Sequence, residues 1–138
     1  MVSAQNWLDQ NYPKEKRSQI TELDISSKNL EGDLNLTDFT NLFKLNISLN
    51  ELTHFHLWGI NDPINLYFEN DVIEEIDCSY NNFNTSWGVW KTGALKKLNF
   101  SNNNVNSSSF IAHNLAYLDT VNNNLAELDL PQAIIWLI

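Results

Sequence analysis

The chain has 138 residues, of which 43% are hydrophobic and 12% aromatic, and a formal net charge of −9. This length predicts one domain with a real core, and the apolar content is too high for a disordered chain. Eight basic residues against seventeen acidic ones leave no concentrated basic surface. The composition therefore argues against a nucleic-acid binder and against docking on anionic membranes.

Cysteine usage and the absence of long apolar segments predict a cytoplasmic location. Cys78 is the one cysteine of the chain, so no internal disulfide can form. The first eighteen residues lack the apolar core of a signal peptide. The longest apolar run is the five residues 134–138, far short of the ~20 needed to cross a bilayer.

The first predicted element is a short helix over residues 3–12. Ser3 can cap its first turn, Trp7 and Leu8 give it an apolar face, and Pro13 ends it. We expect residues 1–19 to form a helical cap over the first edge of the structure that follows.

Residues 20–130 contain five similar segments, which start at residues 20, 42, 73, 95 and 115. Each has apolar residues at its first, fourth, sixth and eleventh positions, except that Thr120 takes the sixth position of the last one. Positions four and six point to the same face of a strand, and one such strand cannot bury that face alone. Stacked copies can, so the pattern predicts a parallel β-solenoid.

Asparagine stands at position nine in four of the five segments, and Lys28 replaces it in the first. An amide side chain has donors and an acceptor, which suits it to pair with backbone where a strand turns away. The sequence therefore predicts a structural asparagine ladder, made of Asn50, Asn81, Asn103 and Asn123.

The pattern L-x-x-L-x-L-x-x-N-x-L resembles that of the leucine-rich repeat superfamily and covers nearly the whole chain. The resemblance implies an α/β repeat solenoid with right-handed parallel strands. Periods near 22 residues leave room on its convex side for short 3₁₀ turns or irregular chain. The N-terminal part, with AQNWLDQNYPKEKRSQITELDIS followed by KNLEGDLNLTDFTNL, resembles leucine-rich repeat proteins abundant in arbuscular mycorrhizal fungi.

Positions three, five and seven of the repeats are expected to form three columns on the concave face. The resemblance makes this face a candidate surface for a protein partner, with these residues as candidates: Glu75, Asp77, Lys97, Asn99, Tyr117, Asp119 and Val121. The alternative is a solvated ladder with no ligand, because opposite charges alternate down the first column.

Two other segments could carry a function. The connection over residues 57–71 is an insertion long enough to build a binding loop, and its aromatic residues add to that possibility. The apolar tail 131–138 has no polar cap after it, which leaves three alternatives. The tail folds over the last repeat, the natural protein continues, or the end self-associates.

Catalytic and metal-binding patterns are weak. Cys78 occupies a core position, His54 and His56 lack an obvious third ligand, and no glycine-rich phosphate loop is present. We therefore expect no enzyme activity, no catalytic residue, no metal and no cofactor. The expected function is that of a scaffold, adaptor or regulatory module for protein recognition. The alternatives are a receptor-type extracellular recognition domain and a structural fragment without a dedicated ligand.

Overall fold

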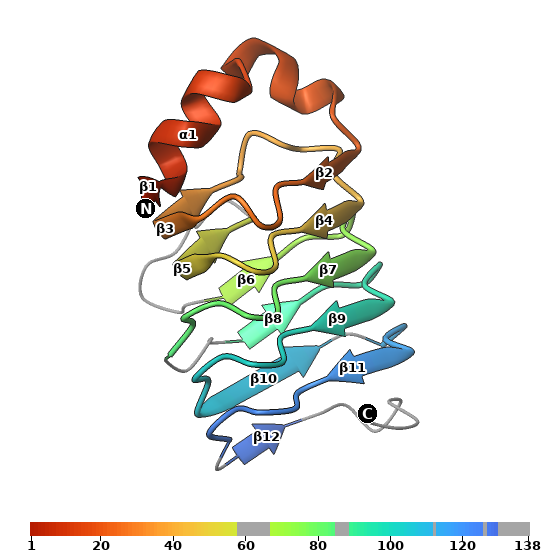
Figure 1. The fold of residues 1–138 in the computed structure, drawn as a ribbon. Helices are drawn as coiled ribbons and strands as arrows, with labels where there is room; N and C mark the ends of the chain where they lie inside the picture. Colours follow the sequence, from red (N-terminus) through yellow and green to blue (C-terminus); the bar gives the residue numbers. More distant parts are fainter. Residues whose placement is uncertain (58–66, 85–88, 112, 126, 130–138) are drawn as a thin grey trace.

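The computed structural model describes residues 1–57, 67–84, 89–111, 113–125 and 127–129. Most of the insertion predicted at 57–71 and all of the tail 131–138 lie outside these residues. The described strands stack in two parallel columns that run side by side down the molecule (Figure 1).

One column is a five-stranded parallel sheet in the order β11-β9-β7-β4-β2. Its strands are β2 (Glu22–Asp24), β4 (Lys44–Asn46), β7 (Glu75–Asp77), β9 (Lys97–Asn99) and β11 (Tyr117–Asp119). The register aligns position four of all five repeats: Leu23, Leu45, Ile76, Leu98 and Leu118 are successive partners. The predicted repeat alignment and parallel solenoid are thus confirmed by the strand register.

The other column corrects the expectation of 3₁₀ turns or irregular chain on that side. It holds one parallel sheet made of β1 (Val2–Ser3), β3 (Leu30–Asn35) and β5 (Glu51–His56). A second parallel sheet contains β6 (Tyr67–Glu69), β8 (Val89–Lys91), β10 (Ser107–Ile111) and β12 (Glu127–Asp129).

The strand sequences explain why this side is regular. In β3, buried Leu30 and Leu34 alternate with exposed polar residues, which is the period of a half-buried strand. A β-bulge interrupts the pairing of β3 with β5 between Gly32 and Asp33, and Gly32 has a φ of +85°, which a side chain rarely tolerates. Strands pair on both sides of the solenoid, so successive turns are separated by the same inter-strand distance on each side. We therefore expect the solenoid to curve little.

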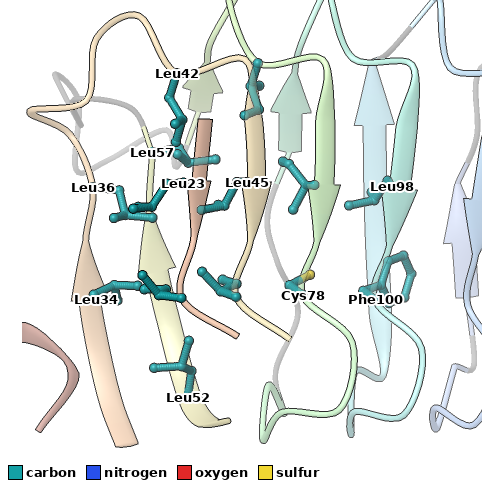
Figure 2. Packing of buried hydrophobic residues seen from close by; sticks show 14 of the residues in the cluster. Leu23, Leu34, Leu36, Leu42, Leu45, Leu52, Leu57, Cys78, Leu98 and Phe100 are labelled. Atoms are coloured by element: carbon teal, nitrogen blue, oxygen red, sulfur yellow. The ribbon is translucent and has the colours of Figure 1, made fainter. Parts of the chain in front are cut away.

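The core lies between the two columns. Figure 2 shows Leu23, Leu45 and Leu98 of the five-stranded sheet in one row of the core, with Leu34 and Leu36 of the first turn near the Leu23 end of that row. Positions six and eleven add further buried rows. Stacked rows of branched side chains bury the apolar face that a single repeat would expose.

The predicted N-terminal helix is present as α1 (Ala4–Asn11), followed by the 3₁₀ helix η1 (Lys14–Gln19). Ser3 accepts a hydrogen bond from the Asn6 N–H (3.5 Å), and buried Leu8 faces the core, with α1 against β3. Figure 1 shows both helices at the β2 end of the stack.

Arg17 joins the helices to the first repeat although its side chain is only 1% exposed. Its guanidinium contacts Asp9 (2.7 Å) and Asp38 (3.5 Å), and its Nε donates to the Tyr12 carbonyl (2.9 Å). The guanidinium also lies 5.6 Å from the Phe39 ring centroid. This buried cation therefore links α1, η1 and the turn at residues 38–39.

Candidate functional site

The candidate site is the outer surface of the sheet β11-β9-β7-β4-β2, here called the five-stranded face. In each three-residue strand, position four is buried, so positions three and five point outward. Position three carries Glu22, Lys44, Glu75, Lys97 and Tyr117, and position five carries Asp24, Asn46, Asp77, Asn99 and Asp119.

Opposite charges pair along the position-three column. The Glu75 carboxylate lies 3.7 Å from the Lys44 ammonium and 3.8 Å from the Lys97 ammonium. Both lysine side chains are more than half exposed, so each pair contributes at most about 1 kcal/mol to stability. The column is therefore a set of solvated charges that a partner could reach.

Position five is held in place by local hydrogen bonds. In every repeat its Oδ1 accepts the backbone N–H two residues later, at 3.0–3.1 Å. In the first three repeats it also accepts the serine hydroxyl of position seven, at 2.6–2.7 Å. Hydrogen bonds from the Ser26 hydroxyl and then its N–H lower the pKa of Asp24. These bonds fix the column before any partner binds.

Position seven does not form the third exposed column that the repeat pattern predicts. Ser48, Ser79 and Ser101 are buried in the turns that follow the strands. Val121, at the same position of the last repeat, is 49% exposed and has no hydroxyl for Asp119 to accept. The exposed surface is thus narrower than predicted, two columns wide over most of the sheet.

A shallow hollow of about 310 Å³ lies over β4, β7, β9 and β11. Five of the predicted residues line it: Glu75, Asp77, Lys97, Asn99 and Tyr117. The structure places Asp119 beside Asn99 in the sheet but does not bring Asp119 or Val121 into the hollow.

The four predicted ladder asparagines form one repeated set of hydrogen bonds. Each Oδ1 accepts a backbone N–H at position eleven of the preceding repeat, that of Leu30, Leu52, Phe83 or Val105 (2.9–3.1 Å). Each Nδ2 donates to the position-six carbonyl of that preceding repeat, that of Ile25, Ile47, Cys78 or Phe100 (2.9–3.1 Å). The ladder therefore ties every turn to the one before it.

Each ladder asparagine bonds to the repeat before it, which explains why Lys28 can replace asparagine in the first repeat. A position-nine amide there would reach toward a preceding repeat, and the chain has α1 and η1 before it instead. The Lys28 N–H itself donates to Asn50, so the first turn is still held by the second.

Position eight is a feature that the sequence analysis missed. All five residues there have positive φ, between 53° and 56°: Ser27, Leu49, Tyr80, Asn102 and Asn122. Asparagine adopts this left-handed conformation readily, but leucine and tyrosine do so at a cost. Leu49 and Tyr80 are also 53% and 54% exposed, so packing does not account for their presence. The available signal was the NN pair at positions eight and nine of the last two repeats, residues 102–103 and 122–123.

Cys78 and His54, the two side chains weighed above for nucleophilic or metal-binding chemistry, both lie off the outer surface of the five-stranded face. Burial raises the pKa of the Cys78 thiol, which donates to the Asn99 carbonyl (3.4 Å), so it is a poor nucleophile. His54 contacts Asp33 (3.1 Å) and Thr53 (3.3 Å) on β3 and β5, away from the five-stranded face. Among described residues, no three metal-ligating side chains gather, and no helix could cross a membrane.

Comparison with known proteins adds no identification to this geometry. No family model matches the chain, and no curated protein matches it.

Proposed function

We propose that the chain is a right-handed leucine-rich repeat solenoid that acts as a non-catalytic protein-recognition module, and that its partner binds on the five-stranded face. The observation that carries the proposal is the mixed-charge surface of positions three and five on a rigid frame. Its reachable charges lie over a shallow hollow, whereas the position-five side chains are already fixed by hydrogen bonds.

The shape of this surface favours a macromolecular partner over a small substrate. A small-molecule site is usually a concave pocket that encloses most of its ligand. The hollow here lies open over several strands and is lined by both charges, two amides and the Tyr117 ring. Tyrosine at the end of such a surface is a residue type that often anchors protein interfaces.

The same proposal includes a reducing compartment such as the cytoplasm, since the one cysteine is a buried thiol. A receptor-type domain would instead be found glycosylated in native material, and a fragment without a ligand would capture no partner.

The proposal is tested by affinity capture from source-cell lysate with three proteins. These are the wild type, the triple variant Lys97→Glu, Tyr117→Ala, Asp119→Lys, and a control triple variant. The control, Lys14→Glu, Glu51→Lys, Thr53→Ala, makes the same kinds of change outside the five-stranded face and keeps the same net charge. Circular dichroism and urea unfolding establish that all three are folded.

A protein captured by the wild type and the control but lost by the face variant supports the proposal. Equal capture by the face variant would move the binding site off the five-stranded face. Capture of nothing by any of the three would favour a structural role without a ligand.

A further inference from the structure

The charges on the first four strands of the five-stranded face form an even, alternating series. In sheet order, β2, β4, β7 and β9 carry Glu, Lys, Glu and Lys at position three, and Asp, Asn, Asp and Asn at position five. A series of this kind is its own complement when it is reversed. Reversal is what a two-fold axis parallel to the strands, midway between β4 and β7, produces in a facing copy.

We propose that the partner of this face is a second copy of the same chain, related by that two-fold axis. The proposal rests on the proposed function and names its partner. With the axis in that place, β4 faces β7 of the second copy, and β2 faces its β9. Every lysine at position three then faces a glutamate, and every aspartate at position five faces an asparagine, which can donate to it.

The unexplained position-eight residues fit the same axis. Leu49 follows β4 and Tyr80 follows β7, and adjacent turns are joined by the hydrogen bond from the Leu49 N–H to the Ser79 carbonyl (3.0 Å). The axis places Leu49 opposite Tyr80 of the second copy and Tyr80 opposite its Leu49. Two exposed side chains of each copy, held at a conformational cost, are thus brought into register at the edge of the interface that follows the strands.

Charge and area set the expected strength. Four three-residue strands give a contact well below the roughly 800 Å² per partner of a standard stable interface. Each copy also carries a net charge of −9, so long-range repulsion opposes association. The dimer is therefore expected to be weak and to tighten at moderate salt, because screening acts most on the long-range repulsion.

The net charge also identifies the competing occupant, a basic segment of another protein. Such a partner would respond to the sign of a charge change on the face. At moderate salt, where the long-range repulsion is screened, the dimer would respond to the match between facing residues, whatever the sign. Variants of Glu22 and Lys97 separate these outcomes. Across the axis, Glu22 of one copy faces Lys97 of the other, whereas within one copy the two residues lie three strands apart.

The first measurement is sedimentation equilibrium of wild type, Glu22→Lys, Lys97→Glu and the double swap, with unfolding curves as the folding control. Each single variant creates two like-charge contacts across the axis, so the dimer dissociation constant should rise by about three- to tenfold. The swap restores both contacts and should return it to the wild-type value. Opposite effects of the two single variants would overturn the dimer and favour a basic partner.

The second measurement is zero-length carbodiimide cross-linking of an equal mixture of isotopically light and heavy chains. Lys97 and Glu22 are about 14 Å apart within one copy at ordinary strand spacing, so their cross-link should join light to heavy chains. Only light–light and heavy–heavy products, or a monomer at every concentration, would refute the dimer.

A third variant separates binding from folding. Tyr80→Asn should weaken the dimer while it stabilises the monomer, because asparagine accepts the left-handed conformation. A monomeric wild type that still captures a lysate protein through the five-stranded face would refute the dimer and leave the proposed function intact.

Discussion

Replacement of Asn81 by alanine tests the ladder at its centre. The Asn81 side chain is almost fully buried, and its Oδ1 accepts the Leu52 N–H at 2.9 Å. Its Nδ2 donates to the carbonyls of Ile47 (2.9 Å), Cys78 (3.2 Å) and Ser79 (3.2 Å). Alanine removes all four bonds at once.

The magnitude follows from which groups keep another partner. The Ile47 carbonyl still accepts from Asn50, the Cys78 carbonyl from Asn103, and the Ser79 carbonyl from the Leu49 N–H. The Leu52 N–H is then left without the amide, in a residue that is fully buried. An unsatisfied buried donor costs about 1–3 kcal/mol, so we expect the free energy of unfolding to fall by that amount.

Urea denaturation measures the change, with Asn82→Ala as the matched control. Asn82 is the next residue, is exposed, and makes one long side-chain contact with Glu51 (3.4 Å). Its variant should stay within about 0.5 kcal/mol of the wild type. An Asn81→Ala midpoint equal to that of Asn82→Ala would refute the ladder as a source of stability.

Three further predictions concern other parts of the fold. Lys28→Asn should change the free energy of unfolding by less than about 0.5 kcal/mol in urea denaturation, because a first-repeat amide has no preceding repeat to bond; a gain of 1 kcal/mol or more would contradict this. Leu49→Asn should raise the free energy of unfolding, measured by thermal denaturation, by about 0.5–1 kcal/mol, because asparagine adopts a positive φ at lower cost than leucine. A fall in the free energy of unfolding would show that the leucine side chain contributes packing. The hydrogen bond from Arg17, then that from Gln5, lowers the pKa of Asp9 below its ordinary 3.8. Above about pH 4 the free energy of unfolding should therefore be higher for the wild type than for Asp9→Asn, and this difference should disappear as the pH falls through the lowered pKa. A difference that stays constant across an acid titration would contradict the ion pair.

The repeat register and the asparagine ladder could be predicted because both depend on residue types at fixed spacing. Position four must be apolar to fill the core, and position nine must carry a donor and an acceptor. These requirements appear directly as Leu45, Leu98, Asn81 and Asn103.

Other features could not be read from spacing alone. The second column of strands does not follow from the repeat period, because a period near 22 residues is also compatible with short turns on that side, although β3 itself shows the alternation of a strand. Ser48 and Ser79 are buried and not exposed on the five-stranded face, because the strands end at position five and do not continue to position seven. The Arg17 network depends on contacts of Arg17 with Asp9 and with Asp38, which are far apart in the sequence.

The most direct test of the central claim is to map the binding surface by NMR. The ¹⁵N-labelled chain would be titrated with its captured partner, or diluted if the partner is a second copy. Chemical-shift changes are expected to concentrate at residues 44–46, 75–77 and 97–99, with residues 30–35 and 51–56 unaffected. Changes confined to residues 30–35 and 51–56 would contradict recognition through the five-stranded face.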